Sequence, residues 1–143
     1  MPSCFFIGHR DAPKELLPAI RAAAERLIRE EVTDFYVGSR GSFDRLAASA
    51  VRALRESYPE IRLFLVLAYL PSARQVLPEG FTSSVFPEGL EKVPRRYAIL
   101  RANRALVDRC EYLVAYAPHV TSNARKVAEY ARRKGRRVIE VGK

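Results

Sequence analysis

The fold is decided by residues 34–44, which read DFYVGSRGSFD. Residues 34–37 have the length and apolar character of a short buried strand, and Gly38 ends it. From Phe43 to Leu54, apolar residues recur at the three- and four-residue spacing of one helix face. A strand that passes through a short glycine loop into a helix is the unit from which parallel sheets are built, so we expect a βαβ arrangement here.

The same alternation extends in both directions along the chain. Further strands are predicted for four apolar runs, residues 4–7, 61–67, 112–116 and 138–141. Further helices are predicted over residues 16–28, 95–108 and 121–134. Strands that alternate with helices form a parallel sheet with right-handed crossovers. The sequence therefore predicts an α/β protein, a Rossmann-like three-layer sandwich with a mainly parallel sheet, folded as a single domain over residues 1–143.

Two segments fit this alternation less well. Pro18 lies inside the first helical pattern, so either the helix begins at Pro18 or an earlier turn is kinked. Residues 71–94 contain several prolines and only one short strand-like run, residues 84–86. A connection of this length with little regular structure is often functional, and in an enzyme it would act as a lid.

The composition is that of a globular protein, with 48% hydrophobic and 29% charged residues. The longest uncharged apolar run, residues 63–70, is too short to span a bilayer, so no membrane partner is expected. The first residues lack the basic region and cleavage site of a secretory signal. Cys4 and Cys110 lie in apolar surroundings and are expected to be reduced, buried thiols. Together these observations predict a cytoplasmic protein.

The formal net charge of +9 raises the question of nucleic-acid binding. Basic residues are concentrated between Arg132 and Arg137, where they close a predicted helix and suit the negative end of its dipole. No aromatic residue is interleaved within this run, as a stacking platform for single strands requires. Specific nucleic-acid binding is therefore not expected, and a solvated basic surface is the simpler interpretation.

Candidate site residues follow from the predicted sheet. In an open parallel sheet, ligands bind beyond the carboxyl ends of the strands, near the point where the strand order reverses. Asn103 also belongs to the candidates, because its amide falls on a buried helix face and either ties down the long loop or faces the pocket. The candidate ligand-binding residues are Gly8, His9, Arg10, Gly38, Ser39, Arg40, Gly41, Ser42, Asp44, Tyr69, Asn103, His119, Thr121 and Ser122.

The glycine loop after the second strand is the strongest of these motifs. Gly38 and Gly41 let backbone N–H groups turn toward an anion, the following helix presents its positive end, and Arg40 adds a cation. The alternative is that the glycines make only a tight turn, with Ser42 as the helix cap. Asp44 falls in the first turn of that helix, where a carboxylate is favoured without any function. It is also the best candidate for orienting polar groups of the loop.

Other kinds of site find no support in the sequence. The two histidines do not form a helical pair and the two cysteines are isolated, so no metal site is predicted. Neither the GxGxxG fingerprint nor a P-loop is present, and no cofactor is predicted. No nucleophile elbow or Ser-His-Asp order is present, so no catalytic residue is assigned.

Four motifs, in this order along the chain, resemble the SLOG superfamily. They are residues 5–10 (FFIGHR), 35–44 (FYVGSRGSFD), 65–71 (LVLAYLP) and 112–116 (YLVAY). The superfamily consists of Rossmann-like domains and includes YpsA-like proteins and the Lonely Guy enzymes. The chain is most similar to small bacterial members of unknown function. The resemblance implies a phosphate-bearing, nucleotide-derived ligand held by the glycine loop and by the loop after residue 116.

This resemblance does not imply an established reaction. Lonely Guy enzymes cleave the base from a nucleoside monophosphate and carry a PGGxGT segment followed by a catalytic glutamate. The corresponding residues 117–125 read APHVTSNAR, so the paired glycines and the glutamate are both absent. The leading hypothesis is therefore a non-catalytic or regulatory nucleotide-binding domain. The alternative is a nucleotide-processing hydrolase of phosphoribohydrolase type with Asp44 or Glu88 as the acid. A third hypothesis is a basic nucleic-acid-associated module, and a homo-oligomer is compatible with each.

Overall fold

The computed structural model describes residues 2–69 and 77–142. Within these residues the strands are β1 (Ser3–Gly8), β2 (Asp34–Val37), β3 (Arg62–Val66), β4 (Ser83–Val85), β5 (Tyr112–Tyr116) and β6 (Arg137–Glu140). The α-helices are α1 (Leu17–Arg29), α2 (Ser42–Arg55), α3 (Ala98–Arg109) and α4 (Asn123–Arg133). Short 3₁₀ helices are η1 (Lys14–Leu16), η2 (Leu90–Lys92) and η3 (Arg95–Tyr97).

The strands form one sheet in the order β4-β3-β2-β1-β5-β6, and every neighbouring pair is parallel. This confirms the predicted α/β, Rossmann-like fold, and the described part of the sheet is wholly parallel. From β1 the chain builds outward through β2, β3 and β4, and it then returns to the other side of β1 as β5. The strand order therefore reverses between β1 and β5, which is where open α/β sheets bind ligands.

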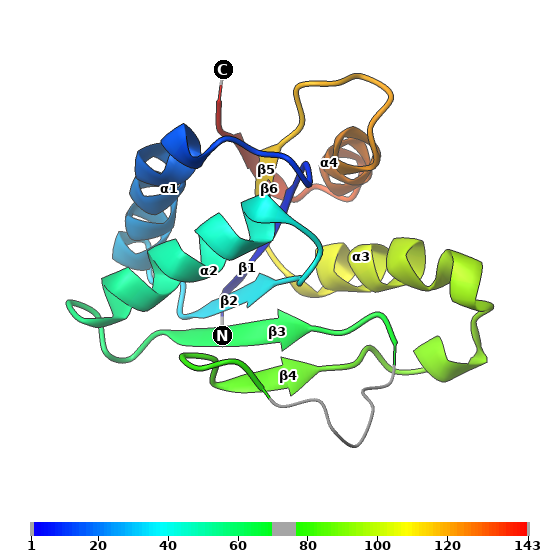
Figure 1. Cartoon of the computed structure of the whole chain (residues 1–143), viewed down its shortest axis with the longest axis horizontal. Helices are drawn as coiled ribbons and strands as arrows, with labels where there is room; N and C mark the ends of the chain where they lie inside the picture. Colours follow the sequence, from blue (N-terminus) through cyan, green and yellow to red (C-terminus); the bar gives the residue numbers. More distant parts are fainter. Residues whose placement is uncertain (1, 70–76, 143) are drawn as a thin grey trace.

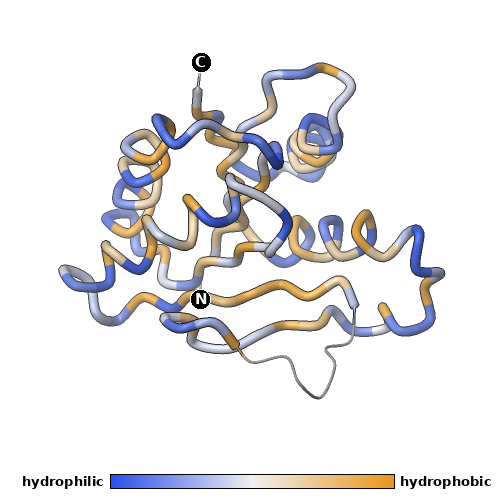
Figure 2. Tube along the Cα trace, viewed as in Figure 1, coloured by the Kyte–Doolittle hydropathy of each residue, from blue (hydrophilic) through white to orange (hydrophobic). Residues whose placement is uncertain are grey.

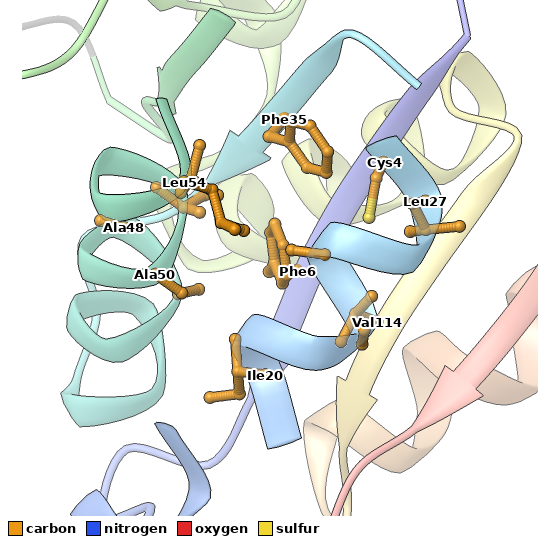
Figure 3. Close-up of a cluster of buried hydrophobic side chains, with 14 of the residues drawn as sticks. Cys4, Phe6, Ile20, Leu27, Phe35, Ala48, Ala50, Leu54 and Val114 are labelled. Atoms are coloured by element: carbon orange, nitrogen blue, oxygen red, sulfur yellow. The ribbon is translucent and has the colours of Figure 1, made fainter. Parts of the chain in front are cut away.

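The helices cover the two faces of the sheet in pairs (Figure 1). α1 packs beside α2 on one face, and α3 packs beside α4 on the other. Side chains of β1 alternate between the two cores, because successive residues of a strand point to opposite faces. Cys4 and Phe6 belong to the core under α1 and α2, while Phe5 and Ile7 belong to or contact the core under α3 and α4. Figure 3 shows Phe6 among side chains of the first core.

Each helix is amphipathic, which explains why it lies flat on the sheet. In α2 the buried residues include Ala47, Val51 and Leu54, at the spacing of one helix face. Figure 2 shows β3 as a hydrophobic stretch and each helix as alternating hydrophobic and hydrophilic segments. Among the described residues, no helix is both long and apolar enough to cross a bilayer.

The segment around Pro18 and part of the long connection over residues 71–94 both form regular secondary structure. Pro18 lies in the first turn of α1, where its missing N–H would have no intrahelical partner in any case. The strand expected at residues 84–86 is β4, one residue earlier, and it pairs with β3 at the edge of the sheet. Residues 71–76 of the long connection lie outside the described part of the chain.

Both ends of α4 are capped. Ser122 is the N-cap, and its Oγ accepts a 3.1 Å hydrogen bond from the N–H of Arg125. At the other end, Gly135 has a φ of 77°, the left-handed conformation that favours glycine after a helix. The cap places the start of α4 at the carboxyl edge of the sheet.

Candidate ligand-binding site

A cavity of about 520 Å³ opens at the carboxyl ends of β1, β2 and β3. Its walls come from the end of β1 with the loop after it, the loop after β2, the end of β3, α3, and the start of α4. The volume lies in the range of about 300–1,000 Å³ that is typical of small-molecule sites. The cavity is therefore in the position that the fold predicts for a ligand.

Most candidate residues line this cavity. Those in its wall are Gly8, His9, Arg10, Gly38, Ser39, Arg40, Asp44, Tyr69, Asn103 and Ser122. Those outside the wall are Gly41, Ser42, His119 and Thr121. The loops chosen from the sequence thus converge, but residues within one loop have different roles.

Gly41 and Ser42 fasten the glycine loop to the loop after β1. The N–H of Ser42 donates a 2.7 Å hydrogen bond to the carbonyl oxygen of Arg10, and its Oγ lies 2.7 Å from the same oxygen and 2.9 Å from that of Ala12. A Cβ on Gly41 would lie 2.5 Å from the Cα of Arg10. The expectation that Ser42 caps α2 is wrong, because Gly41 is the N-cap and the Ser42 hydroxyl bonds to the other loop. Gly41 itself is extended, with φ 178°, so crowding and not a left-handed backbone requires glycine there.

Asp44 holds the turn of the glycine loop from beneath. Asp44 is only 8% exposed, and its Oδ2 accepts a 2.8 Å hydrogen bond from the N–H of Arg40. Burial raises the pKa of the Asp44 carboxyl, while the hydrogen bond and the charge of Arg40 act in the opposite direction. Because the N–H groups of Arg40 and Ser42 have partners within the protein, an anion at this loop would rely on the Arg40 side chain and the remaining N–H groups.

His9 contributes a polar atom without a partner. Its Nε2 is buried and makes no hydrogen bond within the described residues. The ring packs edge-on against His119, with 4.8 Å between centroids, and against Tyr116 at 5.8 Å. Burial lowers the pKa of His9, and the neighbouring His119 adds to this effect. Burial therefore favours the neutral form of the imidazole, and a buried polar atom of this kind calls for a partner that a ligand could supply.

Cations gather around Tyr69 at the edge of the cavity. The guanidinium of Arg40 lies 5.2 Å from the centre of the Tyr69 ring, and that of Arg95 lies 4.1 Å from it. Such cation–π contacts restrict where the two side chains rest. Arg40 itself lines the cavity, so Tyr69 holds a cation at the wall.

The apolar part of the cavity wall was not predicted from the sequence. Ile7, Val66, Ile99 and Ala102 line the cavity, and they resemble ordinary core residues in the sequence. In the sequence, the one indication that this helix face lines a cavity is Asn103, which is 8% exposed and lies in the same wall. Its amide makes no hydrogen bond within the described residues, so the structure supports the interpretation that Asn103 faces the pocket.

The loop after β5 contributes less than expected. His119 and Thr121 are exposed and outside the cavity wall, although His119 supports the ring of His9. The base of the loop is held by Arg125, which donates a 2.7 Å hydrogen bond to the carbonyl oxygen of Ala117. Ser122, together with the first residues of α4, is the part of this segment that reaches the cavity.

Glu88, the other candidate acid, lies elsewhere. It lines a separate cavity of about 340 Å³ with Asp108 and Tyr130. Across residues 2–69 and 77–142, no group of three His, Cys, Asp or Glu residues is placed to hold a metal ion. The main cavity thus combines cations at its edge, a buried imidazole nitrogen without a partner among the described residues, the buried carboxyl group of Asp44 and an apolar wall.

Comparisons with known proteins bear on the fold. No protein-family model matches the sequence, and no curated protein matches it. Among solved structures, the chain is similar to the X-ray structure of DNA processing protein A (DprA) from Streptococcus pneumoniae, with a TM-score of 0.72 at 19% sequence identity. The match covers 98% of this chain and 50% of the DprA chain, so the chain spans about half the length of DprA. At this identity the likeness shows a shared fold.

Proposed function

We propose that this protein binds a nucleotide or a nucleotide-derived ligand, phosphate included, in the cavity at the carboxyl edge of the sheet. One observation carries the proposal. Arg10, Arg40 and the partnerless Nε2 of His9 line a single cavity whose remaining wall is largely apolar.

The polar side of the cavity suits a phosphate. Arg10 and Arg40 are exposed arginines, and the guanidinium of Arg40 rests against Tyr69 at the cavity wall, where an anion can reach it. The first residues of α4 also line the cavity, so the positive end of that helix faces the same space. Ser39 adds a hydroxyl group, whereas the hydroxyl of Ser122 already donates to the carbonyl oxygen of His119. The arginines, Ser39 and the N–H groups at the start of α4 are therefore the candidate donors to a phosphate.

The apolar side suits a flat ring. Ile99 and Ala102 on α3, with Ile7 and Val66 from the sheet, offer a surface against which a base can pack. A ligand with an anionic end and an apolar ring uses both sides of the cavity, and nucleotides have both parts. Because the fold is similar to that of a protein named for DNA processing, the end of a nucleic-acid strand is an alternative ligand. Five segments of the chain enclose the cavity, and this enclosure favours a small ligand over a long strand.

A thermal-shift panel of inorganic phosphate, nucleoside monophosphates and nucleoside diphosphates tests the proposal. A ligand at a hundredfold excess over Kd stabilises the folded state by about 2.7 kcal/mol. For a domain of this size, that corresponds to a shift in Tm of several degrees. We expect at least one nucleotide to produce it.

Variants locate the site. Arg40→Ala should lose most of the shift without changing the stability of the free protein. The matched control is Arg21→Ala, an exposed arginine of α1 outside the cavity, which should keep the full shift. The proposal is wrong if no compound of the panel shifts Tm, or if the shift is equal in the wild type, Arg40→Ala and Arg10→Ala.

A second candidate function is hydrolysis of the bound nucleotide, with Asp44 as the acid. The observation in its favour is the burial of Asp44 in the cavity wall, which raises the pKa of its carboxyl as a general acid requires. Glu88 has no part in this candidate, because it lies in the other cavity. We expect nucleoside monophosphates to release no free base above background. Release that disappears in Asp44→Asn would establish the hydrolase.

A further inference from the structure

Buried polar side chains are not distributed evenly in this protein. Among the described residues, Ser3, Asp34, Asp44 and Asn103 are the polar or charged residues that are buried. Ser3 and Asp34 lie at the starts of β1 and β2 and bond to other side chains. Asp44 and Asn103, from helices on opposite faces of the sheet, both line the main cavity.

A carboxylate in this position is unfavourable for an anion-binding site. It repels a phosphate, and its burial opposes ionisation. A neutral oxygen could accept the N–H of Arg40 equally well, so the turn of the loop does not require a charge. In the described part of the chain, that N–H is the one hydrogen-bond donor to Asp44, and it occupies Oδ2. A charged acceptor becomes favourable when the ligand itself donates to it, because hydrogen bonds to charged groups are the stronger ones.

We infer that the ligand is a ribonucleotide whose sugar hydroxyls donate to Asp44, so that the cavity selects ribose over 2′-deoxyribose. This inference rests on the proposed function. Asp44 is bonded to the backbone of Arg40, the residue whose side chain is proposed to hold the phosphate. In a nucleotide the sugar is joined directly to the phosphate, whereas the base lies one ring farther away. The donors nearest to Asp44 are therefore hydroxyls of the sugar.

The test measures Kd by calorimetry for matched pairs of nucleoside 5′-monophosphates: AMP with dAMP, GMP with dGMP, CMP with dCMP, and UMP with dUMP. We expect the ribose member of the pair that binds to be tighter by about 10- to 100-fold, the value of a hydrogen bond to a charged group. The 3′-deoxy analogue of the same nucleotide shows whether the second hydroxyl also takes part.

The Asp44→Asn variant tests the residue. It keeps an oxygen for the N–H of Arg40 but removes the charge, so the preference for ribose should fall to a few-fold. Asp11→Asn is the matched control, because Asp11 is an exposed acid of the neighbouring loop outside the cavity wall, and the preference should be unchanged. If Asp44 only holds the turn, the variant weakens both members of a pair equally, and the inference is wrong.

The outcomes separate the two proposals. If both members of each pair bind equally to the wild type, nucleotide binding stands and the selection of ribose is wrong. If no member of any pair binds, the inference fails, and the proposed function fails with it only if no compound of the thermal-shift panel shifts Tm. The ratio measured on the wild type does not depend on the folding of any variant.

Discussion

Two aspartates flank β2, one at each end of the sheet, and they have different partners. Asp34, at the start of β2, is 6% exposed, and both of its oxygens are bonded to Arg62, at 2.9 and 2.8 Å. Asp44, beyond the carboxyl end of β2, is 8% exposed and accepts one hydrogen bond, from the N–H of Arg40. At the amino end of the sheet, the buried carboxylate has both of its oxygens bonded within the protein, while at the carboxyl end the buried carboxylate accepts a single hydrogen bond from the described residues.

The difference does not mean that the carboxyl end is loosely built. Its loops are locked together by the hydrogen bonds between Ser42 and Arg10 and by the close approach of Gly41. Among the described residues, the buried Nε2 of His9 at this end is left without a partner. A rigid backbone that carries partnerless polar groups is what a preorganised site requires, because its geometry is fixed before the ligand arrives.

The largest effect is expected for Gly41→Val, which tests the rigidity of the carboxyl end. A Cβ there would lie 2.5 Å from the Cα and 2.8 Å from the carbonyl oxygen of Arg10, and a backbone cannot move aside as a flexible side chain can. We expect a loss of about 3 kcal/mol in the free energy of unfolding, measured by urea denaturation.

Gly135→Ala is the control for this variant. Gly135 is in the left-handed conformation but has no atom within 4 Å of an added Cβ. It should therefore lose only the cost of that conformation, about 1–2 kcal/mol. A larger loss for Gly135→Ala than for Gly41→Val would contradict the interlocked loops.

The next effect concerns the amino end. Arg62→Ala leaves Asp34 buried without its paired donor, and we expect the free energy of unfolding to fall, but by less than in Gly41→Val, because Arg62 is itself exposed. Equilibrium urea denaturation measures the change, with Arg21→Ala as the exposed control. A change as small as that of the control would show that the pairing of Asp34 with Arg62 does not stabilise the amino end of the sheet.

Asp44→Asn should act in the opposite direction and raise stability. The pKa of Asp44 is raised in the folded state, so the unfolded state ionises more readily and ionisation disfavours folding. This penalty is absent below the ordinary pKa of 3.8 and grows as the pH rises above it. We expect a gain of about 0.5–2 kcal/mol at pH 7 that shrinks as the pH is lowered toward 3.8, measured by thermal unfolding. A loss of stability at pH 7 would show that the charge itself supports the fold.

The smallest effect is expected for the thiols of the amino end. Cys4 and Cys110 are buried, burial raises the pKa of Cys110 to about 12, and it raises the pKa of Cys4 as well. Alkylation at pH 8 followed by mass spectrometry should therefore find no labelled cysteine in the folded protein. Complete labelling in urea is the control. Fast labelling of the folded protein would show that Cys4 or Cys110 is accessible, and it would contradict the burial of both thiols.

The sequence predicts the elements of this fold because apolar periodicity depends on neighbouring residues. The strands over residues 34–37 and 112–116 agree with the structure to the residue. The loops of the site were also predictable, because parallel strands end at the same edge of a sheet. What lies within those loops was not, since it depends on contacts between distant segments. Ser42 resembles a helix cap until its hydroxyl is placed against the carbonyls of Arg10 and Ala12.

The apolar half of the cavity could not be predicted for a different reason. Ile99 and Ala102 follow the same helical spacing as the buried residues of α3, and periodicity does not distinguish a side chain that packs in a core from one that lines a cavity. Asn103 is distinguishable, because an amide on a buried face needs partners. Polar residues at apolar positions were thus the more informative signal.

The position of β1 in the centre of a wholly parallel sheet has a consequence for folding. β1 pairs with β5, and the hydrogen bond between Ser3 and Glu111 joins residues 108 positions apart. Contacts between such distant segments slow folding, because a long loop must close before any of them forms. During synthesis, at about 5–20 residues per second, β1 leaves the ribosome several seconds before β5. Until β5 and α4 arrive, the core around Phe5 lacks Leu113, Ala115 and Val127. A nascent chain halted before residue 112 therefore leaves one face of β1 incompletely covered, and we expect it to expose apolar surface.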